Sequence, residues 1–240
     1  MIHDVIELYY GRMALQILFE DNHLISINKE NSEIVQGDKT GDIPLVEKVK
    51  NYIKKKDSKP GNVFLGIPHR LDRPTSGIVV FAKTSKALSR MNELFREKRI
   101  EKKYWAIVDS LPESREKKII HYLVRDRTRN KSMAYDHPVN GGREAVLSYN
   151  VIGASDNYFF LEIFLYTGRH HQIRSQLARI GSHIKGDLKY GARRSNKGGG
   201  IYLHARELSF THPVKKTKLL ITAPPPEDIL WKAFTGCMSK

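Results

Sequence analysis

The segment His69–Gly77 (HRLDRPTSG) places an acid between two arginines, directly before an apolar run. Its proline and glycine disfavour regular structure, so we expect Asp72 to lie on a constrained loop at the end of a strand. A neighbouring guanidinium favours the ionised form of a carboxylate, which can act as a general base or a nucleophile. Alternatively, Asp72 only forms an ion pair with Arg70 or Arg73 that orders the loop. The residues by themselves leave both interpretations open.

Ten histidines make a metal site the next chemistry to test. The chain has no His-x-x-x-His pair, no HExxH motif and no cysteine cluster, and the adjacent His170 and His171 would point in different directions on a helix. It also lacks a GxxxxGK[ST] loop, a strand–GxGxxG–helix unit and a GxSxG elbow. We therefore expect neither a metal nor a nucleotide cofactor.

Hydrophobic patterning predicts strands with a few helices between them, which favours an α+β fold on a mixed sheet. The expected strands are short apolar runs rich in β-branched and aromatic residues. They are Leu24–Lys29, Gly77–Lys83, Tyr104–Val108, Ala145–Ile152 and Tyr158–Leu165.

Apolar residues at helical spacing predict helices at Leu45–Lys56, Ser85–Arg99 and His170–Ile180. Ser85 is the expected N-cap of the second helix, and Gly181 is expected to end the third. We expect Ala223–Pro226 (APPP) to mark the end of the folded core. No linker or repeat is evident, so residues 1–240 are interpreted as a single domain.

Positive charge dominates the composition, with 41 Lys and Arg against 26 Asp and Glu and a formal net charge of +15. The excess lies in two windows, Lys98–Lys131 and Arg169–Lys218, which also contain several aromatic residues. Either window could be a merely solvated surface. Together they predict contact with a nucleic acid through its phosphates.

The single cysteine, Cys237, has no partner for a disulfide, which indicates a reducing compartment. The first ten residues lack the features of a secretory signal, and no apolar run approaches the length of a membrane span. We expect a cytoplasmic protein with no membrane contact, and a monomer because no helical seam is evident.

Several ordered segments resemble the RluA-type RNA pseudouridine synthases. HRLDRPTSG is similar to the family's signature, and Ile17–Lys29 (ILFEDNHLISINK) is similar to its first motif. Glu101–Val108 (EKKYWAIV) resembles the strand with the active-site tyrosine, and Thr167–Arg174 (TGRHHQIR) resembles the third motif. His183–Gly191 and Leu203–Pro213 follow it as they do in the family. The resemblance covers roughly residues 15–225.

The resemblance implies a catalytic domain on a mixed, mostly antiparallel sheet with flanking helices and a cleft between two sheet halves. It also implies the isomerisation of uridine to pseudouridine in ribosomal or transfer RNA, without metal or cofactor. In the family the aspartate, here Asp72, is catalytic. It could attack C1′, add to C6 of the base, or remove the C2′ proton to give a glycal, and the glycal route is the one we favour.

Other roles follow from the same resemblance. Tyr104 is expected to stack on the flipped uracil, although by pattern alone it could be a core tyrosine. Arg174 is expected to pair with Asp72, and Arg70 to fill the space that the uridine leaves in the RNA. Arg169 would order its loop or contact phosphate. The remaining expected RNA contacts are His69, Arg73, Lys102 and Lys103.

The chain departs from the family pattern at three places. The usual Lys-Pro-x-Gly reads Lys29–Ser32 (KENS), which puts the course of residues 30–37 in doubt. His170 stands where Thr is common, and Ser175 where Val is common. The first motif begins near residue 17, so we expect no accessory RNA-binding domain before it. An RNA-binding protein without turnover and a metal-dependent nuclease are the competing hypotheses.

Overall fold

The computed structural model describes residues 15–38 and 40–237, which form two compact units. The first unit contains the described residues up to Ile100 together with Glu207–Pro224. The second contains Glu101–Arg206 and the described residues from Pro225 onward. The interpretation of the whole chain as one catalytic domain stays a prediction.

Ten strands and four α-helices are formed by the described residues. The strands are β1 (Ile17–Glu20), β2 (Leu24–Lys29), β3 (Ser76–Ala82), β4 (Glu101–Val108), β5 (Glu116–Asp126), β6 (Lys131–Tyr135), β7 (Arg143–Ala154), β8 (Phe159–Leu165), β9 (Leu203–Thr211) and β10 (Lys218–Thr222). The helices are α1 (Leu45–Lys56), α2 (Ser85–Arg96), α3 (Gln172–Arg179) and α4 (Ile229–Cys237), with a short 3₁₀ turn η1 (Leu188–Tyr190). The predicted α+β class with a mixed sheet is confirmed.

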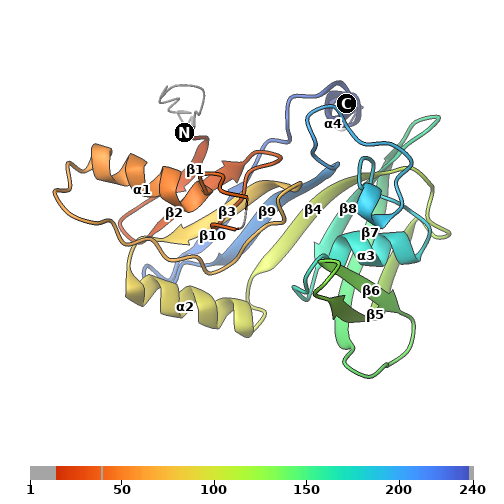
Figure 1. Ribbon diagram of the computed structural model, residues 1–240, viewed down its shortest axis with the longest axis horizontal. Helices are drawn as coiled ribbons and strands as arrows, with labels where there is room; N and C mark the ends of the chain where they lie inside the picture. Colours follow the sequence, from red (N-terminus) through yellow and green to blue (C-terminus); the bar gives the residue numbers. More distant parts are fainter. Residues whose placement is uncertain (1–14, 39, 238–240) are drawn as a thin grey trace. The chain divides into compact units, whose positions relative to one another are not determined.

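In the first unit the strand order is β1–β2–β3–β9, and β10 pairs with β9. The β1/β2, β2/β3 and β9/β10 pairs are antiparallel. α1 and α2 lie on opposite faces of these strands (Figure 1). Successive residues of β3 therefore face different helices: Val80 packs with the α2 side and Phe81 with the α1 side. Burial on both faces explains why this strand is a continuous apolar run.

In the second unit, which contains the first residues of β9, the strand order is β9–β4–β8–β7–β5–β6. The pairs of β4 with β8, β8 with β7, β7 with β5 and β5 with β6 are all antiparallel. α3 covers one face through Ile173 and Leu177, which join a cluster with Ala106 of β4. Trp105 faces the other side and packs with α4. β4 is thus also buried on both faces.

The three predicted helices form, and two of them have boundaries that differ from the prediction. α1 has the predicted bounds, whereas α2 ends at Arg96 and α3 begins at Gln172. The N-cap of α2 is Thr84, whose hydroxyl accepts the Ala87 N–H at 3.1 Å, so the prediction of Ser85 as the cap was wrong by one position. Thr84 has the extended backbone that a cap requires, while Ser85 already begins the helix.

The prediction that the core ends at Ala223–Pro226 was also wrong. The chain continues into α4, where Trp231 and Phe234 are buried against Trp105 and Phe160. The Trp231 and Phe160 ring centroids are 5.9 Å apart in an edge-on arrangement. The proline run therefore separates two packed segments. No helix within residues 15–38 and 40–237 is long and apolar enough to cross a membrane.

The packing of α4 predicts that Trp231→Ala destabilises the second unit. Removing a buried tryptophan from a core leaves a large cavity and costs roughly 3–5 kcal/mol. Urea unfolding should show this loss, while Lys232→Ala, at an exposed position on the same helix, should leave the midpoint nearly unchanged. Equal midpoints for the two variants would contradict the role of α4 in the core.

Candidate active site

The Asp72 loop connects an isolated bridge at Gly66 to the start of β3. Gly66 exchanges both backbone hydrogen bonds with Ala82, at 2.8 and 2.9 Å. The loop then closes in a turn in which the Asp72 carbonyl accepts the Thr75 N–H at 3.0 Å. The Asp72 side chain is half-buried. The predicted constrained loop before a strand is thus present in the first unit.

His69 anchors this loop to the unit's core. Its Nε2 accepts the backbone N–H of Val80 at 2.9 Å, so this nitrogen carries no proton in that arrangement. Its ring stacks on Phe95 of α2 with centroids 4.8 Å apart. These contacts show that His69 helps to hold the loop in place. Its contact with RNA stays a prediction.

Lys29 is a buried cation directly beneath the same loop, and the sequence analysis assigned it no role. Its side chain is 1% exposed, and Nζ donates to the carbonyls of Glu30, Glu33 and Arg73 at 2.8, 2.9 and 3.1 Å. Burial lowers the pKa of Lys29 to about 8, while the nearby carboxylates of Glu33 and Asp72 oppose that shift. Two of these hydrogen bonds therefore hold the turn after β2, and the third joins it to the Asp72 loop.

The departure from Lys-Pro-x-Gly does not remove the turn after Lys29. Ser32 adopts φ +70°, a conformation that glycine takes most easily, and its N–H donates to the Arg73 carbonyl at 3.0 Å. The course of residues 30–37, which the sequence left in doubt, is thus a turn that binds the Asp72 loop.

The two arginines that flank Asp72 are both exposed. Arg70 contacts Gln36 through Nη1 at 3.3 Å, and Arg73 forms an ion pair with Asp42 at 2.6 Å. Surface pairs of this kind are weak, so either guanidinium could be released to an RNA phosphate at little cost.

β4 presents Tyr104 and its two neighbouring lysines on alternate faces. Tyr104 is half-buried and packs against the cluster that α3 covers. Lys102 shares this face, and its Nζ approaches Gly168 in the turn before α3. Lys103 points to the opposite face, where it pairs with Glu162 at 3.2 Å. Of the two predicted lysine contacts, only Lys102 lies on the side of Tyr104.

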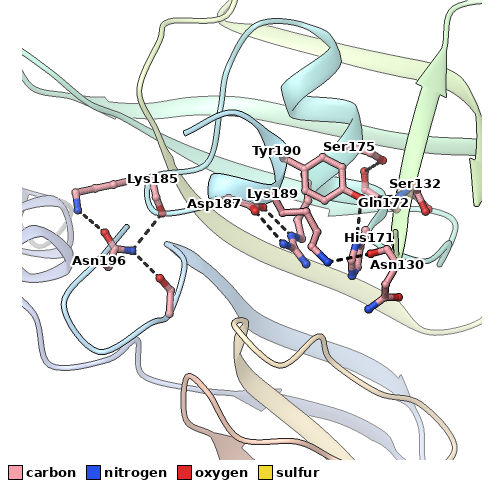
Figure 2. Close-up of polar contacts among 12 residues, drawn as sticks. Asn130, Ser132, His171, Gln172, Ser175, Lys185, Asp187, Lys189, Tyr190 and Asn196 are labelled. Carbon is pink, nitrogen blue, oxygen red and sulfur yellow. Dashed lines mark hydrogen bonds and ion pairs between the residues drawn. The ribbon is translucent and has the colours of Figure 1, made fainter. Parts of the chain in front are cut away.

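Arg174 is buried in α3. Its side chain is 5% exposed, and Nε and Nη2 donate to the two carboxylate oxygens of Asp187 at 2.7 and 2.8 Å. Asp187 is 1% exposed, and Figure 2 shows it accepting both bonds. The carboxylate balances the positive charge of the buried guanidinium, and the bidentate geometry fixes the plane of the guanidinium. The pairing of Arg174 with Asp72 stays a prediction.

A polar cluster packs beside this ion pair (Figure 2). The Tyr190 ring lies 5.0 Å from the Arg174 guanidinium, and its hydroxyl accepts the Ser132 N–H at 2.7 Å. The hydroxyl is also 2.9 Å from Nδ1 of His171. Burial, with Arg174 and His170 as further causes, lowers the pKa of His171 to about 2, so its imidazole is neutral at physiological pH.

Arg169 and the departure residues His170 and Ser175 hold the turn and the first part of α3. Arg169 donates Nε to the Glu144 carbonyl at 3.0 Å, and its N–H donates to Gln172. His170 stacks on His171, and the buried Ser175 donates to the Gln172 carbonyl at 3.1 Å. Arg169 therefore orders its loop, one of the two roles expected for it.

Within residues 15–38 and 40–237, no group of three or more His, Cys, Asp or Glu side chains could hold a metal ion together.

Comparisons with known proteins give a consistent result. The family described as RNA pseudouridylate synthase matches residues 23–179. Ribosomal large subunit pseudouridine synthase C of Buchnera aphidicola subsp. Baizongia pistaciae is 33% identical over 216 residues, which cover 87% of this chain and 66% of that protein. Ribosomal large subunit pseudouridine synthase D of Zymomonas mobilis subsp. mobilis is 34% identical over 229 residues, covering 90% and 71%. The chain thus spans about two thirds of the length of these relatives.

A solved structure shares the fold. Human RNA Pseudouridylate Synthase Domain Containing 4 has a TM-score of 0.75 over 90% of each chain, at 24% sequence identity.

The buried ammonium of Lys29 predicts a pH dependence of stability. Its pKa of about 8 is below the ordinary 10.5, so unfolding takes up a proton between these values. The contribution of this group to the free energy of unfolding therefore rises with pH across that window, by up to about 3 kcal/mol. Urea unfolding from pH 7.5 to 10 should show a smaller rise for Lys29→Met than for Lys54→Met, an exposed control. Identical pH profiles would contradict the burial of a charged Lys29.

The Arg174–Asp187 pair predicts a large loss on removal of the acid. Asp187→Asn leaves a buried guanidinium without its counter-charge, which costs roughly 3–5 kcal/mol. Asp136→Asn removes the partner of the exposed Arg179 and should change little. Thermal unfolding of both variants measures the difference, and similar midpoints would argue against a structural role for the buried pair.

Proposed function

Because the chain belongs to the RNA pseudouridylate synthase family, we propose that it isomerises uridine to pseudouridine in RNA. The observation that carries the proposal is the match over residues 23–179, which includes Asp72, Tyr104 and Arg174. The reaction breaks the bond between ribose and N1, rotates the uracil and rejoins it at C5. The product is an isomer of the substrate: C5 loses a proton to water as the new bond forms, and N1 gains a proton, so no further substrate is consumed.

We propose Asp72 as the catalytic residue. A carboxylate can remove the C2′ proton to form a glycal, attack C1′, or add to C6, and the glycal route makes it a general base. The Lys29 ammonium and the Thr75 turn support this assignment, because they hold the loop backbone at the Asp72 carbonyl and at the following residue, Arg73. Fixing the carboxylate before the uridine arrives lowers the entropy lost in reaching the transition state.

A paired uridine must leave the helix before its glycosidic bond can be reached, which costs a few kcal/mol. We propose that Arg70 fills the vacated space, since it is exposed and its guanidinium is held by a long 3.3 Å contact to Gln36. Tyr104 would stack on the flipped uracil, a contact worth about 1–3 kcal/mol for bases in general. Its half-buried position on β4 leaves part of the side chain accessible.

Arg174 would keep the Asp72 carboxylate ionised and oriented. The bidentate bond to Asp187 supports this role, because it fixes the plane of the guanidinium. Arg73, His69, Lys102, Lys103 and Arg169 are the further residues that we propose as RNA contacts.

Ribosomal RNA is the substrate that the relatives' names favour, since two of them are called ribosomal large subunit pseudouridine synthases. Transfer RNA stays the alternative, and we propose a monomer acting in the cytoplasm without metal or cofactor. An RNA-binding protein without turnover is disfavoured by the presence of Asp72, Tyr104 and Arg174. A metal-dependent nuclease is disfavoured by family membership.

Replacing Asp72 by Asn tests the proposal. The wild-type protein should form pseudouridine in bulk cellular RNA containing 5-tritiated uridine, with release of tritium in the presence of a chelator. Asp72→Asn should reduce the rate by at least about 10⁴-fold, because the amide can serve neither as base nor as nucleophile. Its affinity for RNA should stay nearly unchanged.

The matched control is Asp57→Asn, which makes the same chemical change at an exposed residue after α1. It should retain full activity. Turnover by Asp72→Asn would refute the assigned role, and RNA cleavage that stops in chelator would support a nuclease instead. Wild-type protein that forms no pseudouridine in ribosomal or transfer RNA would overturn the proposed activity.

A further inference from the structure

The turn between β5 and β6 gathers positive charge in the second unit. Arg125 lies at the end of β5, Arg127 and Arg129 lie in the turn, and Lys131 begins β6. Lys189 of η1 joins them from a segment more than fifty residues further along the chain. We call these five residues the cationic turn.

Direct contacts hold η1 against the turn. Lys189 Nζ donates to the Asn130 carbonyl at 3.2 Å, a bond that Figure 2 shows. Lys131 Nζ lies 5.0 Å from the centroid of the Tyr190 ring. Two elements distant in sequence therefore bring their cations to one surface.

The turn itself has a defined conformation. Asp126 Oδ1 accepts the Thr128 hydroxyl at 2.7 Å and the Arg129 N–H at 3.0 Å. Asn130 adopts φ +46°, and its Oδ1 lies 3.1 Å from His170 Nε2. The backbone from which the cations project is thus ordered before any ligand binds.

The positive charge of this surface is poorly balanced. The cationic turn contains five cations, and the nearby Asp126 is engaged in the turn and 3.7 Å from Arg129. In the described part of the chain, Arg125 and Arg127 are exposed and form no ion pair with a carboxylate. Repulsion between these like charges lowers the free energy of unfolding. A bound polyanion would offset that repulsion.

Two residues of the cationic turn also affect a buried histidine. Lys189 and Arg125 both contribute to lowering the pKa of the buried His171, after the larger effects of burial, Arg174 and His170. The two cations from different elements therefore act on one point inside the unit.

We propose that the cationic turn binds the phosphate backbone of RNA. The proposal rests on the proposed function and deepens it, because none of these residues is among those assigned to the uridine. Arginine can form two parallel hydrogen bonds to one phosphate group. Contacts of this kind increase the affinity for RNA and position it on the protein, but they do not distinguish one base sequence from another. RNA is favoured over an acidic protein because the proposed substrate is itself a polyanion.

The test removes two exposed charges whose side chains form no ion pair with a described carboxylate. Arg125→Gln/Arg127→Gln is compared with Lys54→Gln/Lys86→Gln, which removes the same net charge from exposed positions on α1 and α2. Binding of a fluorescein-labelled RNA hairpin is measured by anisotropy over a range of KCl concentrations, with Asp72→Asn in every protein so that no turnover occurs.

Loss of two phosphate contacts should lower the slope of log affinity against log salt by about 1.4 to 1.8, and weaken binding roughly tenfold at about 0.1 M salt. The control pair should change affinity less than about twofold. The urea midpoint of the arginine variant should be unchanged or higher, since like-charge repulsion is relieved. With Asp72 present, KM should rise while kcat stays the same.

Equal affinities and slopes for the two double variants would overturn the proposal, as would a lower kcat at unchanged KM. A larger loss of binding to polyglutamate than to RNA would assign the surface to an acidic protein and also overturn it. Failure of the proposed activity is distinguishable, because the labelled RNA would still bind through Arg125 and Arg127 in a protein that forms no pseudouridine.

Discussion

A buried cation surrounded by oxygen acceptors is the constraint on which the candidate site of each unit depends. In the first unit the Lys29 ammonium donates to three backbone carbonyls, and in the second the Arg174 guanidinium meets both oxygens of Asp187. A cation removed from water is strongly destabilising without such partners, so these segments can pack only in arrangements that supply them. The Asp72 loop and the turn around η1 are fixed in this way.

The two cations are satisfied by different means, which suits their proposed roles. Lys29 binds neutral carbonyls and retains its positive charge near Asp72 and Glu33, with its pKa lowered by burial. Arg174 binds a carboxylate in a rigid bidentate geometry, which favours a fixed orientation. The ammonium of Lys29 thus joins two backbone segments through three carbonyls, whereas the planar guanidinium of Arg174 is held in one orientation.

Much of the fold followed from hydrophobic patterning, because the central strands are buried on both faces. β3 and the second half of β4 are apolar runs for that reason, and α1 has the predicted bounds. Sequence patterning missed β5 and β6, whose exposed residues include Ile120 and Met133 alongside several charges. It also missed α4, because a proline run suggested an end where the chain turns back to bury Trp231. The N-cap was misplaced by one residue because two adjacent residues carry hydroxyls, and only backbone geometry distinguishes them.

The sequence by itself determined the family, the α+β class and the residues proposed for chemistry, since these depend on local motifs and on apolar periodicity. It also placed the excess charge in two windows. Only the tertiary structure decided that Lys29 lies beneath Asp72, that Asp187 is the partner of Arg174 and that Lys189 joins the β5–β6 turn. The physical reason is that these contacts join residues up to about sixty positions apart, and their partners are selected by burial and geometry, which local pattern does not encode.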